Sequence, residues 1–193
     1  MKVKQDREVW EKEYGSGAWD WLSSTSEFAH YSMVAAYVQM RKSPASLLDL
    51  GCGEGVFLRY LDENLLSEYT GVDIAQSALD RIHPKRTSDR YICSSLEAYR
   101  PDRKWDVILF NEVLYFMYSP VALLTKFENC LNPEGYIVIS MHQKTNPFCD
   151  NNRCLRKVLK HLGQAKYEVI DNVEIDNGTR WNILTYRVPA AQA

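Results

Sequence analysis

The sequence lacks the cysteine patterns from which zinc sites and disulfide frameworks are built. No CxxC pair occurs and the number of cysteines is odd, so neither a zinc ribbon nor a closed set of disulfides is predicted. Free thiols are typical of a reducing compartment, which favours a cytoplasmic protein. The five cysteines are Cys52, Cys93, Cys130, Cys149 and Cys154.

Long apolar runs and an excess of one charge are missing as well. No apolar stretch approaches the length that spans a bilayer, and the polar N-terminus does not resemble the apolar core of a signal peptide. The 23 Lys and Arg residues nearly balance the 25 Asp and Glu residues, and the net charge of -2 gives no general attraction to nucleic acid or anionic membranes. We therefore expect no nucleic-acid partner and no membrane partner. For the oligomeric state, the expectation is a monomer or homodimer.

Repeats, linkers and low-complexity tracts are also absent, and 193 residues with 46% apolar content suit a single domain, 1–193. From residue 46 onward, short apolar runs alternate with helical patterns, which is typical of a mostly parallel α/β sheet. Ser119 and Pro120 should open the third helix, and Gly163 should close the last. The predicted strands lie near 46–50, 68–73, 89–93, 105–110 and 135–141, and the helices at about 54–63, 75–82, 119–130 and 152–162.

The end of the chain departs from this alternation. Two strand-like runs, 166–176 and 179–188, are joined at Asn177-Gly178, the strongest short hairpin signal. The last two strands should therefore be antiparallel neighbours, which disfavours an ordinary nicotinamide dehydrogenase.

Residues 1–44 are rich in aromatic side chains. Ser24 and Glu27 have capping-box spacing, and apolar residues then follow at helical intervals from Phe28 until Pro44 forces an end. We expect a helical cap over the core, residues 45–193. Two helices that simply pack on the sheet remain an alternative, and both descriptions can hold together.

What is present most clearly is the segment LLDLGCGEG at 47–55, followed by a second apolar run that ends at Asp73. Glycines permit a positive φ and a close approach of backbone to ligand, and a carboxylate after the next strand can accept both ribose hydroxyls. Val56 stands where a dinucleotide fingerprint has its third glycine, and no Lys-Ser or Lys-Thr pair completes a P-loop. The pattern favours a nucleoside without phosphates.

These residues resemble motifs I and II of the class I S-adenosylmethionine (SAM) dependent methyltransferases, LLDLGCGEG and TGVDIAQSAL. WDVILFNEVLYF and LNPEGYIVISM are similar to the fourth and fifth strands of that family, so the resemblance covers residues 45–141. It implies a Rossmann-like seven-stranded, mostly parallel sheet with an antiparallel terminal hairpin and helices on both faces. It also implies methyl transfer from SAM, with S-adenosylhomocysteine (SAH) as product.

The resemblance implies a cofactor site along the ends of the strands. Asp49 would accept from the SAM ammonium or order its loop, Asp73 would bind the ribose, and Ile74 would lie against the adenine. Family members often have an acidic residue after the third strand, where this chain has serines that either cap the following short helix or contact the ligand. Aromatic residues of the cap either close over the cofactor or belong to the core. The implied cofactor-binding residues are Tyr14, Trp19, Tyr31, Asp49, Gly51, Cys52, Gly53, Asp73, Ile74, Ser94, Ser95, Leu96 and Asn111.

The acceptor side is expected after the fourth and fifth strands. Glu112 or Tyr115 should face the acceptor, and His142 is a candidate proton acceptor at neutral pH, or else a structural residue. The carboxylate cluster that would bind magnesium is missing, and so is the NPPY-type segment of amino-methylating nucleic-acid enzymes. We expect no metal and a small-molecule acceptor with an O or N atom, such as a sugar or secondary metabolite. The alternatives are a catalytically silent SAM-binding partner subunit and a nicotinamide-dependent oxidoreductase.

Overall fold

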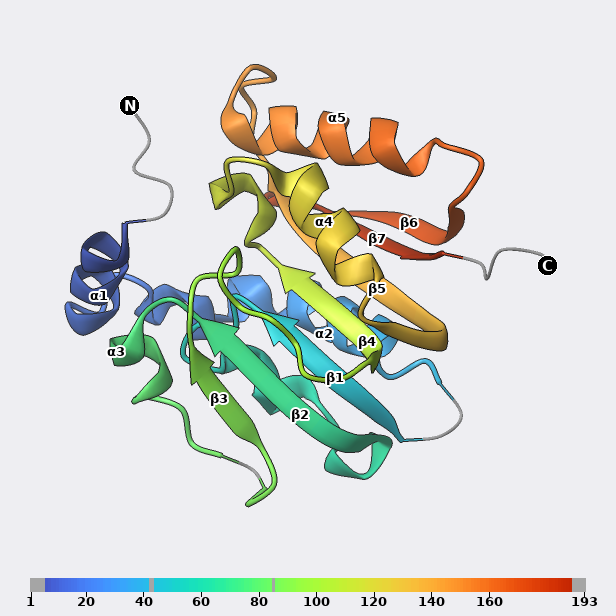
Figure 1. The fold of residues 1–193 in the computed structure, drawn as a ribbon. Coiled ribbons are helices and arrows are strands. Elements are labelled where there is room, and N and C mark those ends of the chain that lie inside the picture. Colours follow the sequence, from blue (N-terminus) through green and yellow to red (C-terminus); the bar gives the residue numbers. More distant parts are fainter. Residues whose placement is uncertain (1–5, 42–43, 85, 189–193) are drawn as a thin grey trace.

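A computed structural model describes residues 6–41, 44–84 and 86–188, so residues 1–5 and 42–43 of the predicted cap lie outside it. One seven-stranded sheet runs through the molecule in the order β3-β2-β1-β4-β5-β7-β6 (Figure 1). The first five strands pair in parallel, and β7 is antiparallel to both β5 and β6. The predicted sheet and its terminal hairpin are thereby confirmed. The strands are β1 (Ala45–Leu50), β2 (Leu66–Asp73), β3 (Arg90–Cys93), β4 (Trp105–Asn111), β5 (Leu131–Gln143), β6 (Glu168–Asp176) and β7 (Arg180–Arg187).

Helices cover both faces of this sheet. In Figure 1, α4 and α5 lie together over one face, α2 lies behind the other, and α1 lies beside α3 near the β3 edge. In the part of the chain that is described, no helix is long and apolar enough to cross a membrane. The helices are α1 (Arg7–Gly15), α2 (Phe28–Val38), α3 (Gln76–Leu79), α4 (Pro120–Glu128) and α5 (Asp150–Leu162).

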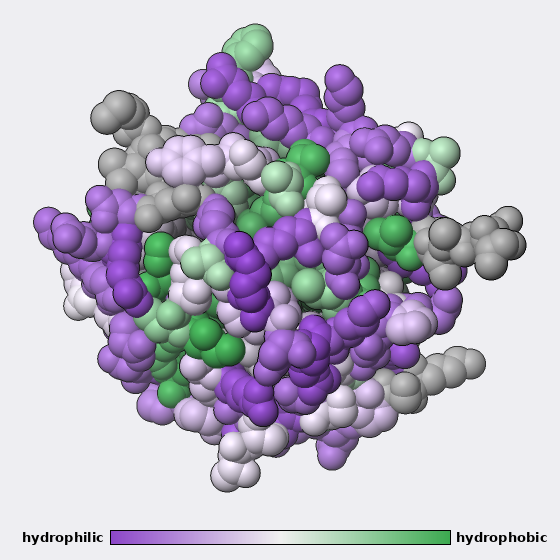
Figure 2. Space-filling model, in the orientation of Figure 1, coloured by the Kyte–Doolittle hydropathy of each residue, from purple (hydrophilic) through white to green (hydrophobic). Residues whose placement is uncertain are grey.

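Alternation of side chains along the central strands divides the core into two layers. In β4, Ile108 and Phe110 pack toward α4 and α5, while Val107 and Leu109 pack toward α2. All four side chains are fully buried, as expected for a central parallel strand covered on both sides. The face shown in Figure 2 is mostly hydrophilic, with hydrophobic patches between the regions of α1 and α4.

The helix predicted at about 54–63 is wrong. A short 3₁₀ helix, Val56–Tyr60, stands there, followed by an extended Leu61 and a second 3₁₀ turn, Glu63–Leu65. Only ten residues separate Gly55 from β2, and they have to bring the chain back from the carboxyl end of β1 to the start of the parallel strand β2. The eight residues of β2 extend about 26 Å at 3.3 Å each. Ten residues of α-helix would reach about 15 Å, whereas the 3₁₀ rise of about 2.0 Å per residue lets the chain travel farther.

The predicted capping box at Ser24 and Glu27 does not form either. Residues 25–27 make a 3₁₀ turn, no side chain caps α2, and the Glu27 side chain is buried instead. The helix ends at Val38, before Pro44.

Smaller differences concern element lengths. The helix predicted at 75–82 is only the single turn of α3, and β5 begins at Leu131, four residues before its predicted start at 135. Pro120 opens α4 as predicted, although the Ser119 side chain makes no capping hydrogen bond.

Candidate functional site

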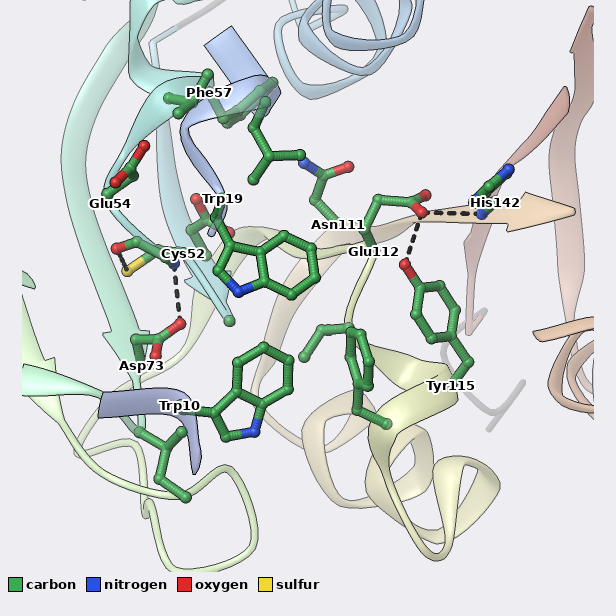
Figure 3. Close-up of a pocket in the computed structure, with 18 of the residues that line it drawn as sticks. Trp10, Trp19, Cys52, Glu54, Phe57, Asp73, Asn111, Glu112, Tyr115 and His142 are labelled. Atoms are coloured by element: carbon green, nitrogen blue, oxygen red, sulfur yellow. Dashed lines mark hydrogen bonds between the residues drawn. The ribbon is translucent and has the colours of Figure 1, made fainter. Parts of the chain in front are cut away.

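One cavity of about 700 Å³ lies at the carboxyl ends of β1, β2, β4 and β5, where the strand order reverses between β1 and β4. Its volume is within the usual range for small-molecule sites. Every cofactor-side and acceptor-side residue predicted from the sequence lines it. Figure 3 shows Asp73 and Glu54 on one side of this cavity and Glu112, Tyr115 and His142 on the other.

The glycine turn brings backbone close to the ligand space. Gly51 N–H and Cys52 N–H both donate to the Val72 carbonyl, at 2.8 and 3.2 Å, which fixes the turn to β2. Gly51 has φ +82°, and a Cβ there would stand 2.6 Å from Val113 Cγ2. Gly53 has φ +54°, and a Cβ there would stand 2.7 Å from the Tyr14 hydroxyl. Both positions therefore require glycine.

Asp73 is held by the backbone on both of its oxygens. Gly53 N–H donates to Oδ2 and Ala75 N–H donates to Oδ1, each at 2.9 Å. Burial raises the pKa of this carboxyl, while hydrogen bonds from the backbone of Ala75 and Gly53 act to lower it. A carboxylate offers about four acceptor positions, so two remain for the hydroxyls of a ribose.

Asp49 is more deeply buried than Asp73, with 1% of its surface exposed. The Tyr69 hydroxyl donates to Oδ2 at 2.8 Å, and Oδ1 is buried without a partner. Burial raises the pKa of Asp49 to about 7; the Tyr69 hydrogen bond opposes this rise, and the charge of Asp73 adds to it. An unpartnered carboxylate oxygen is costly to bury, so it marks a place where a donor or a cation is favourable.

The remaining cofactor-side residues mostly hold the loops together. The thiol of Cys52 packs against Gly71, where a Cβ would stand 2.8 Å away, and burial raises the pKa of this thiol. Ser95 Oγ accepts from Ala98 N–H at 3.2 Å, across a turn at 96–98 that stands in place of the predicted short helix. The carbonyl of Leu96 accepts from Lys126 Nζ at 2.7 Å.

Two further loop residues lie beside the Asp73 end. Ser94 N–H donates to the Asp73 carbonyl at 2.8 Å, and its hydroxyl donates to the Ser95 carbonyl at 3.1 Å. The carbonyl of Ile74 accepts from Arg7 Nε at 3.0 Å, which connects α1 to this loop.

Aromatic rings from the N-terminal segment form part of the cavity wall. Trp10, which is not among the predicted site residues, stacks on Trp19 at 5.8 Å between ring centroids and meets Phe116 edge-on at 4.9 Å. Figure 3 shows the two indoles projecting between the Asp73 side and the Glu112 side. Tyr14 and Tyr31 are both buried, and burial raises their hydroxyl pKa well above the ordinary value.

Glu112 is the centre of the opposite side of the cavity. Its backbone is left-handed, with φ +57°, an uncommon conformation for a residue other than glycine and one often found at functional sites. Oε2 accepts from the Tyr115 hydroxyl at 2.9 Å and from the backbone N–H of His142 at 3.0 Å, and Oε1 accepts from Ser140 Oγ at 2.8 Å. The His142 ring is tilted against Trp181 at 5.8 Å. Burial, followed by the charge of Glu112, raises the pKa of Tyr115.

A buried histidine behind Glu112 was missed by the sequence reasoning. His30 has no exposed surface, and its Nε2 lies 2.7 Å from Ser140 Oγ and 3.1 Å from Asn111 Oδ1. Its Nδ1 lies 3.4 Å from Oε2 of Glu27. The available signals were a histidine among the apolar positions of the 28–38 helix and a lone serine inside the apolar run YIVISM.

A mostly parallel sheet with a glycine turn and a carboxylate at its switch point defines a nucleoside-binding α/β protein. A family model described as a methyltransferase domain matches residues 26–183. The chain belongs to this methyltransferase family, and the resemblance seen in its motifs is confirmed.

Individual relatives are distant. A malonyl-[acyl-carrier protein] O-methyltransferase of Ilyobacter polytropus is 23% identical over 120 residues, which are 58% of this chain and 45% of that protein. This chain thus spans only about half the length of such curated relatives. The N-methyltransferase NodS of Bradyrhizobium japonicum, solved with SAH, has TM-score 0.80 and 15% identity over 95% of this chain and 98% of its own. The [4+2]-cyclase SpnF has TM-score 0.69 and 16% identity over 84% and 81%.

Proposed function

We propose that the protein transfers a methyl group from SAM to an oxygen or nitrogen atom of a small-molecule acceptor. The observation that carries this proposal is the unpartnered Oδ1 of Asp49, buried at the cavity wall beside the glycine turn. A nucleoside that also carries an ammonium group fits this arrangement, because it offers hydroxyls to Asp73 and positive charge to Asp49. A nicotinamide cofactor would instead bring a pyrophosphate to a turn that lacks the third glycine.

When bound, SAM supplies a methyl group that its sulfonium charge has already activated. The residues of this chain then have to hold the two reactants in line and keep water out. Asp49, Gly51, Gly53 and Asp73 hold the donor, and the rings of Trp10 and Trp19 cover the space between the two sides. Glu112, with Tyr115 and His142, faces the acceptor.

Residues 1–44 act as the cap of a single domain in this proposal. Support comes from Arg7, Glu11 and Arg81, which join the N-terminal segment to the loops around Asp73. A cavity of about 700 Å³ suits a small molecule such as a sugar or secondary metabolite. The absence of a nucleic-acid or membrane partner, a cytoplasmic location and a monomer or homodimer complete the proposal.

Calorimetric titration with SAM, SAH and NADH tests the donor. We expect SAM and SAH to bind and NADH not to bind; binding of NADH alone would overturn the proposal.

Incubation with methyl-labelled SAM and metabolite pools then tests the reaction, which the fold alone does not fix because a cyclase shares it. Transfer of label to a small molecule is expected. Bound SAM without transfer, and activity only in a copurified complex, would favour a silent partner subunit.

A further inference from the structure

The hydrogen bonds behind Glu112 have a defined direction. Ser140 carries a single hydroxyl hydrogen, and Glu112 Oε1, 2.8 Å away, can only accept when ionised. The Ser140 oxygen must then accept from its other neighbour, His30 Nε2, at 2.7 Å. Asn111 Oδ1, an acceptor only, also faces Nε2 at 3.1 Å. Two acceptors around Nε2 place a hydrogen on this nitrogen.

The far side of the His30 ring faces Glu27, and one face of the ring lies against Trp181. Nδ1 faces Glu27 Oε2 at 3.4 Å, and the two side chains are 0% and 6% exposed. Nδ1 is buried without a hydrogen-bond partner, so Glu27 approaches the ring without a hydrogen bond to it. Trp181 lies flat against the imidazole, with 5.1 Å between centroids and 1° between planes, which fixes the ring and favours positive charge on it. The ring is therefore held behind Glu112, whose Oε1 lies 3.8 Å from Nε2.

Glu112 lies at the cavity wall, and three hydrogen-bond donors point at its two oxygens. Ser140, Tyr115 and the His142 backbone occupy three acceptor positions, which leaves one for a ligand. An acceptor that brings its own carboxylate to this place would meet like charge, which disfavours its binding. A ligand with an O–H or N–H group would fill the fourth position.

We propose that the methyl acceptor presents an O–H or N–H group to Glu112, which takes its proton, and that His30 positions Glu112 for this role through Ser140. This inference rests on the proposed methyl transfer. For a hydroxyl acceptor, the O–H bond breaks and its proton goes to Glu112, while the oxygen lone pair forms the new bond to the methyl carbon. The methyl–sulfur bond breaks and leaves its electron pair on sulfur. The carboxylate and sulfonium charges disappear together, so charge balances.

The first test is nuclear magnetic resonance of the full chain with ¹⁵N-labelled histidine, saturated with SAH. The chain has four histidines, and the absence of one signal in His30→Gln assigns that of His30. A protonated Nε2 is expected, and a bare Nε2 would overturn the proposal. SAH binding is measured first, because its failure would refute the proposed function rather than this inference.

The second test compares three probes that differ only in their head group: benzyl alcohol, benzylamine and benzoate, each titrated into the SAH-saturated protein. Benzoate should bind about tenfold more weakly than the other two. Glu112→Gln should remove most of that difference while leaving SAH affinity unchanged. The proposal would be overturned if benzoate bound equally or more tightly, if Glu112→Gln left the ratio of probe affinities unchanged, or if none of the three probes bound.

The role of His30 is separated from simple packing by two variants of that residue. His30→Phe keeps a ring against Trp181 and removes both nitrogens, so the preference against benzoate should fall as it does in Glu112→Gln. His30→Gln returns an amide N–H near the Nε2 position and should restore part of the preference. If both variants keep the wild-type ratio, His30 is not a positioning residue.

Discussion

The two sides of the cavity are held by different kinds of hydrogen bond. On the Asp73 side, backbone N–H groups of the glycine turn bind backbone carbonyls, and the N–H groups of Gly53 and Ala75 bind one carboxylate. On the Glu112 side, most hydrogen bonds join one side chain to another, from α2, β5 and the segment after β4, and only the His142 N–H is a backbone donor to Glu112. Backbone hydrogen bonds do not depend on which side chains are present, so the Asp73 side keeps its geometry through most substitutions. The Glu112 side can change with a single substitution. This difference matches a family whose members share a fold but act on different acceptors.

The largest effect is expected from Gly51→Ala, which breaks the backbone-held side. The new Cβ would clash with Val113 and impose the strain of φ +82°, on the order of 1–3 kcal/mol. SAM affinity, measured by calorimetry, should fall by about 100-fold or more. Gly178→Ala is the matched control, since Gly178 has φ +96° with no atom within 4 Å and lies in the β6–β7 turn. If both variants bind SAM equally, the turn does not shape the site.

The same difference explains how far the sequence could lead. The glycine turn, Asp73 and the Asn177-Gly178 hairpin depend on local backbone rules, and the sheet and family predicted from them are confirmed. The connection between His30 and Ser140 spans 110 residues and depends on how α2 packs across the strand ends. No spacing rule encodes such a contact, and Glu27 even resembled a helix cap.

Asp73→Ala should weaken SAM binding by about 1–3 kcal/mol, the scale for lost hydrogen bonds to a charged group. Glu112→Gln sharpens the comparison, because it alters the other side of the cavity and should change SAM affinity less than about twofold. Calorimetric titration of both variants gives the two values. Equal losses of SAM affinity would mean that the two sides do not act separately. An unchanged SAM affinity in Asp73→Ala would contradict the ribose role.

Asp49 gives the backbone-held side a pH dependence. Burial raises its pKa to about 7, above roughly 3.9 in the unfolded chain. The stability that the protonated form contributes is therefore fully present below about pH 4 and lost as pH rises to about 7, at up to about 1.4 kcal/mol per pH unit.

Urea unfolding at pH 5 and pH 7 measures this loss. Asp49→Asn should reduce it, whereas Asp102→Asn at an exposed site should not. SAM affinity should rise over the same range in the wild type, because the ammonium favours the ionised carboxylate. The same pH dependence in wild type and Asp49→Asn would show that this carboxyl is not responsible.

The smallest effect is expected where the cap meets the backbone-held side. The Glu11 carboxylate accepts from the N–H groups of Gln76 and Ser77, at 2.8 and 2.9 Å, and so binds α1 to the start of α3. Hydrogen bonds from Ser77 lower the pKa of Glu11, so this contact stabilises the protein at neutral pH and is lost as pH falls through the acid range. Removing a carboxylate that binds free N–H groups at a helix start costs about 1 kcal/mol.

Glu11→Ala should therefore lower stability by about that amount and speed SAM dissociation, since α1 carries Trp10 and Tyr14 into the cavity wall. Glu8→Ala, an exposed glutamate of the same helix, is the control. Stopped-flow displacement of SAM by SAH, followed by tryptophan fluorescence, compares the dissociation rates. A faster rate in Glu11→Ala alone means that the cap retains the donor through a carboxylate held by backbone N–H groups. Equal rates in both variants would mean that α1 packs beside the site without controlling the release of SAM.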